Sequence, residues 1–144
     1  QLMKAEVIDL STKQSKTTII MADIDEFKKI NDTYGHDCGD LVIKDVADMM
    51  KAVVGEKDVI ARWGGEEYLL MLRGADLEGG KIVAERIRRG IEATSFRYRE
   101  NLLSITITLG VAELDWNLDI DASIKKADEA LYKGKHKSKN CVVS

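Results

Sequence analysis

Apolar positions along this 144-residue chain fall into short strand-like runs and longer stripes with helical spacing. The run Thr17–Ala22 is apolar and rich in β-branched residues, which predicts a buried strand with Asp23 at its C-terminal end. Phe27, Ile30 and Tyr34 then recur at three-residue and four-residue intervals, which predicts a helix directly after the strand. The acidic side chains that follow the strand are therefore expected at the edge of a sheet.

Two consecutive helices are predicted after this strand, each bounded by a capping residue and a glycine. Asp25 is the expected N-cap of the first helix, and Gly35 is placed to end it. Asp40 is the expected N-cap of the second helix, and Gly55 follows its last turn. The apolar stripe of the second helix is expected to face the core and consists of Val42, Val46, Met49 and Val53.

A hairpin is predicted next, formed by Val59–Trp63 and Tyr68–Arg73. The Gly64–Gly65 pair is expected to supply the positive φ angles of a tight turn. Folding of this turn presents Glu66 and Glu67 side by side. Adjacent carboxylates repel each other, which favours a cationic partner such as a metal ion, although a solvated polar turn gives the same pattern.

The second half of the chain predicts a helix over 83–91, further strands, a last helix over 124–131 and a closing strand at Asn140–Val143. Apolar and polar residues alternate over Leu103–Val111, which predicts one half-buried strand, paired with Phe96–Tyr98. Three arginines on the outer face of the 83–91 helix are expected to be solvated: Arg86, Arg88 and Arg89. The element order indicates a single α/β sandwich domain over residues 1–144, with helices packed outside a central sheet.

Composition restricts the function classes. A formal net charge of -3 gives no signal for extended nucleic-acid binding, so any phosphate contacts should be local. Cys38 and Cys141 lack metal-ligand spacing and predict two reduced thiols in a cytoplasmic domain. No apolar run approaches the roughly 20 residues that cross a bilayer, so no membrane contact by this segment is expected.

Three segments of the chain resemble the motifs of a known family and follow one another in the order that the family has. Asp23–Asp40 fits the pattern D-x-D-x-F-K-x-I-N-D-x-x-G-H-x-x-G-D, Gly64–Tyr68 reads GGEEY, and Ala127–Lys135 reads ADEALYKGK. Together they resemble the GGDEF family of diguanylate cyclases. The resemblance implies a mixed central β-sheet flanked by helices, similar to the catalytic domains of class III nucleotidyl cyclases. It also implies the condensation of two GTP molecules into cyclic di-GMP, with release of two pyrophosphates, at a homodimer interface.

The same resemblance implies two Mg²⁺ (or Mn²⁺) ions in each active site. The implied metal ligands are the Asp23 carboxylate, the Ile24 carbonyl and the Glu66 carboxylate. Carboxylates completed by substrate phosphates are the usual Mg²⁺ environment, which agrees with this set. Glu66 is also the expected general base or its metal-linked equivalent, and Glu67 is expected to shape the site. Glu66 stands where Asp is commoner, and the carboxylate is retained.

Triphosphate contacts are implied at two places. The first is the start of the first helix, where the amides of Glu26, Phe27 and Lys28 are unpaired and Lys28 would stabilise transition-state charge. The second is the pair Lys135 and Lys139. A helix C-terminus attracts cations without any ligand, which is the alternative for both lysines. Arg is usual at the position of Lys139, and Lys cannot form a bidentate fork, so weaker triphosphate binding is expected.

Asn31 and Asp40 match the family positions that read guanine, with a carboxylate for the N1 and N2 protons and an amide for O6. Asp40 favours GTP over ATP, because a related branch that makes mixed cyclic GMP-AMP has serine there. His36 is either a buried core histidine or a ribose contact. The family's inhibitory R-x-x-D motif is degenerate, with Gly55 in place of Arg and Asp58 retained. Weak or absent product inhibition is therefore expected.

An L-T-G-L-x-N-R-R segment that family members carry just upstream of their first helix is missing, and Gln1–Leu10 looks like the tail of that helix. A fragment of a larger signalling protein is expected, with a sensory or dimerising region upstream that controls dimer formation. Two other hypotheses remain. A degenerate receptor for GTP or cyclic di-GMP would lose a carboxylate, and Asp23, Glu66 and Glu67 are all present. A protein-interaction module would lack nucleotide binding.

Overall fold

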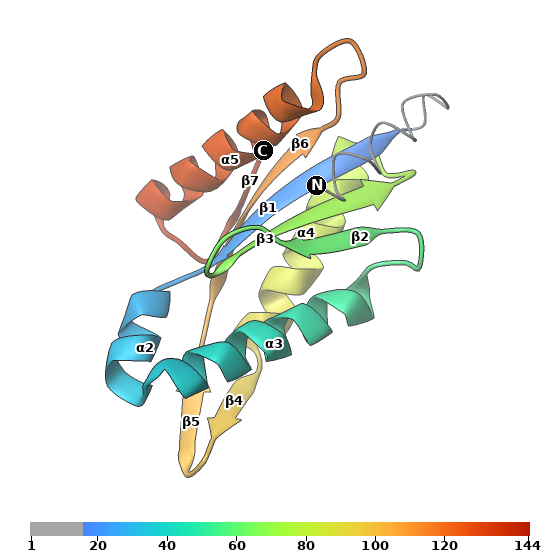
Figure 1. Ribbon diagram of the computed structural model, residues 1–144. Coiled ribbons are helices and arrows are strands. Elements are labelled where there is room, and N and C mark those ends of the chain that lie inside the picture. Colours follow the sequence, from blue (N-terminus) through green and yellow to red (C-terminus); the bar gives the residue numbers. More distant parts are fainter. Residues whose placement is uncertain (1–15) are drawn as a thin grey trace.

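The computed structural model describes residues 16–144, so the helix end expected at Gln1–Leu10 lies outside the described residues. The elements in chain order are β1 (Thr17–Ile24), α2 (Phe27–Tyr34), α3 (His36–Val53), β2 (Val59–Arg62), β3 (Glu67–Arg73), α4 (Leu77–Glu92), β4 (Ser95–Tyr98), β5 (Asn101–Ser104), β6 (Ile107–Glu113), α5 (Ile120–Lys137) and β7 (Val142–Val143). Figure 1 shows them as a twisted sheet with helices on both sides.

The central sheet has five strands in the order β2-β3-β1-β6-β7. β1 lies in the middle and pairs antiparallel with both β3 and β6, whereas β6 and β7 run parallel. The sheet is thus mixed, as predicted. The predicted hairpin is also confirmed, because β2 and β3 are antiparallel neighbours.

Helices cover both faces of this sheet. Ile20 and Ala22 of β1 belong to a core formed with α3 and α4. Ile19 and Met21, which alternate with them, belong to a second core formed with α5. Figure 1 shows α5 on one side of the sheet and α3 and α4 on the other. Burial of both faces explains why the β1 sequence is a continuous apolar run rather than an alternating one.

The prediction of one half-buried strand over Leu103–Val111 is wrong in two respects. The segment forms two strands, β5 and β6, and β5 pairs with β4 in a separate two-stranded sheet that projects beyond the core in Figure 1. Between the two strands, the Thr106 carbonyl accepts a hydrogen bond from the Asp25 amide, at 2.9 Å. β6 is then buried on both faces, including Thr108, because α4 and α5 pack on opposite sides of it.

Both predicted N-caps are also wrong. Glu26 occupies the N-cap position of α2, with a left-handed φ of 57° and no side-chain cap hydrogen bond. The second helix begins at His36, directly after Gly35 with its φ of 94°, so Asp40 lies inside α3. Asp25 instead points its carboxylate away from the helix start toward β6 and the end of α5.

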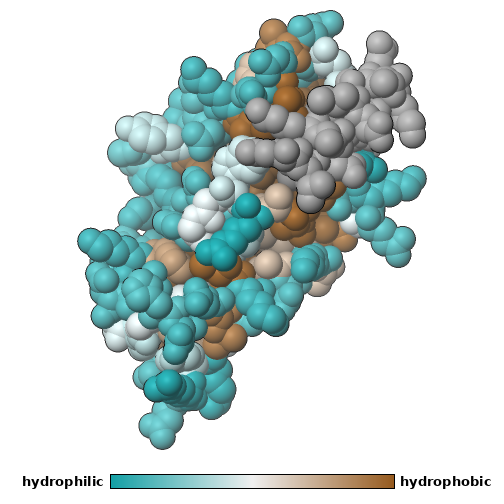
Figure 2. Space-filling view, viewed as in Figure 1, coloured by the Kyte–Doolittle hydropathy of each residue, from teal (hydrophilic) through white to brown (hydrophobic). Residues whose placement is uncertain are grey.

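The surface in Figure 2 is mostly hydrophilic over α2 and the β4–β5 hairpin, with small hydrophobic patches between them. In the part of the chain that the structure describes, the exposed large apolar side chains are scattered over several elements and comprise Trp63, Ile82, Leu102, Leu118 and Tyr132. Within residues 16–144, no helix is both long enough and apolar enough to span a bilayer.

Candidate active site

The acidic turn lies against the C-terminal end of β1. Asp23 is the register partner of Glu67 in the antiparallel β1–β3 pair. One residue further, the Ile24 amide donates a hydrogen bond to the Glu66 carbonyl, at 3.3 Å. The backbone hydrogen bonds between β1 and the β3 end of the hairpin therefore bring Asp23 and the acidic turn together.

The two glycines of the turn do not have the predicted positive φ angles, which occur among the described glycines only at Gly35 and Gly74. Gly64 does lie close to the neighbouring acidic side chain. A Cβ on Gly64 would lie 2.8 Å from Oε1 of Glu67, so the flexible Glu67 carboxylate would have to move to accommodate it. The glycine thus leaves room for the acidic side chain beside it.

Lys135 of α5 reaches into this acidic end of the sheet and is surrounded by oxygen atoms. Its Nζ lies 2.8 Å from Asp23 Oδ1 and 2.7 Å from Asp25 Oδ1. It also donates to the carbonyl oxygens of Asp23 and Ile24, at 3.2 and 3.3 Å. Carboxylate and carbonyl oxygens, which here surround the Lys135 ammonium group, are also the ligands that Mg²⁺ and Mn²⁺ prefer.

The implied metal ligands therefore fit a hard divalent cation as a partial set. Asp23 and Ile24 already direct oxygens at one point, and Glu66 lies on the hydrogen-bonded neighbouring turn. Among residues 16–144, however, no three His, Cys, Asp or Glu side chains gather closely enough to hold a metal ion alone. The remaining coordination places would fall to phosphate oxygens and water, as is usual for Mg²⁺.

The carboxylates at this end of the sheet differ in their affinity for protons. Burial raises the pKa of Asp23, with Glu66 and Asp25 adding repulsion, and these effects exceed the opposing attraction of Lys135. Burial likewise raises the pKa of Glu67, helped by the negative charges of Asp23 and Asp128. Negative charge is therefore unfavourable at Asp23 and Glu67, and a bound cation would relieve the repulsion.

Asp25 behaves in the opposite way and is a residue whose importance the sequence did not reveal. Burial opposes its charge, but hydrogen bonds from Lys135, Thr108 and Thr106 outweigh that effect and lower its pKa. The two threonine hydroxyls donate at 2.7 Å, and the Asn140 amide donates at 2.9 Å. The signal for this arrangement was the pair of threonines at alternate positions in an apolar run.

The residues expected to bind phosphate lie beside this cluster. Lys28 is exposed and Phe27 half-buried at the start of α2, where the first amides have no partner within the helix. Lys139 lies two residues after the end of α5 with a φ of 54°, and its Nζ lies 2.6 Å from Glu26 Oε1. This ion pair lowers the pKa of Glu26 and raises that of Lys139.

The residues expected to read guanine lie where α2 packs against α3. The Asn31 amide oxygen is buried and has no hydrogen-bond partner among the described residues. A side chain at Gly39 would overlap that oxygen, so the glycine allows Asn31 to lie against α3. Asp40, the next residue of α3, and His36 at the start of the helix are both exposed. The buried-core alternative for His36 is therefore wrong.

Comparison with known proteins decides the family. The family model described as "Diguanylate cyclase, GGDEF domain" matches residues 1–141. This chain belongs to the GGDEF family. It is 41% identical over 131 residues to Diguanylate cyclase A of Treponema denticola, a match that covers 90% of this chain and 35% of that protein. It is 36% identical to the probable diguanylate cyclase DgcF of Escherichia coli, covering 90% of this chain and 43% of that protein.

Solved structures agree with the GGDEF assignment. The GGDEF domain of DgcB from Caulobacter crescentus in complex with c-di-GMP superposes with a TM-score of 0.91 at 28% identity, covering 97% of this chain and 84% of that one. The active GGEEF domain of a diguanylate cyclase from Vibrio cholerae gives a TM-score of 0.88 at 31% identity, covering 96% and 88%. The GGDEF fold is therefore shown, whereas the chain spans less than half of the two curated relatives above.

The degenerate inhibitory motif of this GGDEF domain has a structural role. The Asp58 carboxylate accepts hydrogen bonds from the Gly55 amide at 2.8 Å and from the Arg73 amide at 2.9 Å. It thereby closes the loop between α3 and β2 and fixes that loop to β3. Asp58 thus has a structural role in this loop, and weak product binding at the motif stays a prediction.

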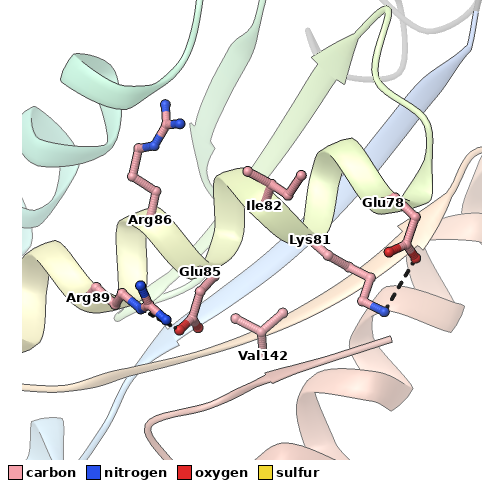
Figure 3. A pocket seen from close by; sticks show the side chains of 7 residues that line it. All are labelled: Glu78, Lys81, Ile82, Glu85, Arg86, Arg89 and Val142. Carbon is pink, nitrogen blue, oxygen red and sulfur yellow. Dashed lines mark hydrogen bonds and ion pairs between the residues drawn. The ribbon is translucent and has the colours of Figure 1, made fainter.

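Two hollows on the surface of this GGDEF domain do not contain the residues expected to bind metal. One, of about 520 Å³, runs along α4 and is shown with its seven lining side chains in Figure 3. The other, of about 540 Å³, lies between α2 and the β5 region and reaches Asp25 and Glu26 at one end. Neither includes Asp23, Glu66 or Asn31, so the nucleotide site is inferred from residue chemistry and not from cavity size.

Proposed function

We propose that this GGDEF domain is a diguanylate cyclase that condenses two GTP molecules into cyclic di-GMP and releases two pyrophosphates. The main observation in its support is the hydrogen bond from the Ile24 amide to the Glu66 carbonyl. This bond places Glu66 next to the oxygen atoms of Asp23 and Ile24 that surround Lys135. The curated relatives named as diguanylate cyclases support the same reaction. GTP as substrate and cyclic di-GMP as product follow from this proposal.

In each half of the reaction, a bond forms between the 3′-oxygen of one GTP and the α-phosphorus of the other, and two such bonds close the cyclic product. The bond from that phosphorus to pyrophosphate breaks, and the proton of the hydroxyl passes to Glu66 or to water that Glu66 orients. Asp23, the Ile24 carbonyl and Glu66 would hold Mg²⁺ or Mn²⁺, which lowers the pKa of the attacking hydroxyl and neutralises phosphate charge. Glu67 shapes the turn around Glu66.

The remaining residues bind and orient the nucleotide. The α2 amides at Glu26, Phe27 and Lys28, together with Lys135 and Lys139, contact the triphosphate. Asn31 and Asp40 read the guanine, and the buried Asn31 oxygen without a partner supports that role. His36 contacts the ribose. Each domain holds one GTP, so catalysis requires two domains facing each other, and an upstream region would control their association.

The test is to incubate concentrated protein with GTP and Mg²⁺ and to identify the products by mass spectrometry. The parent is expected to make cyclic di-GMP, Glu66→Ala to make none, and Glu66→Asp, which keeps the carboxylate, to retain activity. Removal of Mg²⁺ with EDTA should stop the reaction. If GTP binds but no product forms, fusion to a dimeric coiled coil distinguishes a missing dimer from a receptor, and continued inactivity of the fusion would overturn the proposal.

A further inference from the structure

Arg88 on α4 is not solvated as the sequence suggested, because its side chain is only 15% exposed. Its guanidinium makes two hydrogen bonds to the Glu85 carboxylate, at 2.7 and 2.8 Å, and one to Glu92 at 3.1 Å. A further N–H donates to the side-chain oxygen of Asn140, 52 residues away, at 2.9 Å. Arg88 therefore connects α4 to the segment that follows α5.

Asn140 is held on both ends of its side-chain amide. Its oxygen accepts from Arg88, and its Nδ2 donates to Glu92 Oε2 at 2.6 Å. Lys139 and Asn140 both have left-handed backbones, with φ of 54° and 46°, a conformation that is uncommon for lysine and more readily adopted by asparagine. We call Glu85, Arg88, Glu92 and Asn140 the α4 clamp.

The backbone of the same segment is fixed from the opposite side. The Asn140 amide donates to Asp25 Oδ2 at 2.9 Å, and Asp25 Oδ1 accepts from Lys135 at 2.7 Å. Lys139, adjacent to Asn140, bonds to Glu26. Lys135 lies in the last turn of α5, and Lys139 lies two residues after the end of that helix. The position of residues 138–140 therefore depends on α4 through the clamp and on Asp25, the residue that follows β1.

We propose that the α4 clamp is a positioning element for triphosphate binding, which holds residues 138–140 so that Lys135 and Lys139 face the phosphates of the nucleotide. None of the four clamp residues would touch the substrate. The inference rests on the proposed function, because it assumes that these lysines bind phosphate. If it is correct, part of the affinity for phosphate depends on residues of α4, which lies outside the acidic turn.

Arg89 provides a matched control for Arg88. It lies next to Arg88 on α4 and also pairs with Glu85, at 2.8 Å, as Figure 3 shows. Its side chain is 74% exposed, and no hydrogen bond to Asn140 is found for it among the described residues. Arg88→Met and Arg89→Met thus remove the same charge from the same helix, but only the first breaks the clamp.

The test compares two ligands that cannot react, since both lack the attacking hydroxyl. The dissociation constants of 3′-deoxy-GTP and 3′-deoxy-GMP are measured with Mg²⁺ for the parent, Arg88→Met, Asn140→Gly, the double variant and Arg89→Met. Glycine is chosen at position 140 because it accepts the left-handed backbone. The ratio of the two constants reports on the β- and γ-phosphates alone, so a general loss of folded protein cancels.

Removing groups that hold a binding residue commonly weakens affinity by about tenfold or more. We expect Arg88→Met and Asn140→Gly each to weaken 3′-deoxy-GTP binding by about tenfold, with 3′-deoxy-GMP nearly unchanged. The double variant should lose no more than either single variant, because both break one connection. Arg88→Lys should recover part of the affinity, and Arg89→Met should match the parent.

Equal weakening of both ligands, or equal effects of Arg88→Met and Arg89→Met, would overturn the positioning role. Both outcomes leave the proposed function intact, since the parent still prefers the triphosphate. If the parent binds neither ligand, or binds both equally, the proposed function itself fails. The two failures are therefore distinguishable in one set of titrations.

Discussion

Asp23 and Asp25 are two residues apart in the chain, yet their carboxylates have opposite environments. Asp25 is 3% exposed in its side chain and accepts hydrogen bonds from two threonines, a lysine and a backbone amide, which lowers its pKa. Asp23 is 17% exposed and pairs with Lys135, and burial raises its pKa. A carboxylate whose acceptor positions are filled by protein donors maintains the fold. One with oxygens to spare is available to a cation.

The largest expected effect is the loss of activity in Asp23→Asn. The neutral amide keeps the shape but removes the charge that would bind the metal ion, so the rate of cyclic di-GMP formation should fall about 1000-fold, or about 4 kcal/mol in the activation barrier. The thermal unfolding temperature should not fall, because the raised pKa of Asp23 shows that its charge is not a source of stability. A large drop in unfolding temperature would mean that Asp23, like Asp25, stabilises the fold.

Asp25→Asn should show the reverse, with a loss of stability as the primary effect. An amide nitrogen would replace one acceptor and oppose the donors from Thr106, Thr108 or Asn140. We expect a decrease of about 3 kcal/mol in the free energy of unfolding, measured by urea denaturation. An unchanged denaturation midpoint would mean that the hydrogen bonds of the Asp25 carboxylate do not stabilise the fold.

Tyr68→Phe extends the comparison to the neighbour of the acidic pair. The Tyr68 hydroxyl is buried and donates to the Ile43 carbonyl of α3, at 2.7 Å. Phe keeps the aromatic ring and removes only this hydrogen bond, so we expect a loss of about 1 kcal/mol in the free energy of unfolding, with activity retained. A loss of activity with unchanged stability would instead assign the hydroxyl to the site.

The smallest expected effect concerns Glu85, a surface carboxylate that accepts hydrogen bonds from Arg88 and Arg89. Arg88 and Arg89 lower its pKa from 4.5 to about 2. Since the folded pKa lies below the unfolded one, its contribution is present above about pH 4.5 and is lost as the pH falls toward 2. Glu85→Gln should cost less than about 1 kcal/mol at pH 7, because the group is partly solvated.

Urea denaturation of the parent and Glu85→Gln at pH 7 and pH 3 would measure this difference, with the exposed Glu129→Gln as a control. The difference between the parent and Glu85→Gln should shrink at the lower pH. A difference that stays constant with pH would show that packing rather than charge is responsible.

Much of the fold could be predicted because its signals are local. The apolar run before Asp23 and the spacing of Phe27, Ile30 and Tyr34 gave β1 and α2 at nearly their observed bounds. The split within Leu103–Val111 could not be read from alternation, since the Thr106 carbonyl between the two strands bonds to the distant Asp25 amide.

The candidate site shows the same limit. Asp23 and Glu66 could be paired from the motif, because two adjacent strands bring them together. The role of Asp25 could not be predicted, because local rules assign an aspartate before a helix to capping, whereas its donors come from β6 and residues after α5. Arg88 was missed for a similar reason, since its partner Asn140 is 52 residues away.

The central claim is that the carboxylates with spare oxygens, Asp23 and Glu66, hold the metal ions of a bound nucleotide. The most direct measurement is a Mn²⁺ titration in the presence of 3′-deoxy-GTP, followed by electron paramagnetic resonance, on the parent, Asp23→Asn and Glu129→Gln. The account predicts two Mn²⁺ ions per protein–nucleotide complex in the parent and the control, and weaker or fewer ions in Asp23→Asn. Identical binding in all three proteins would contradict it.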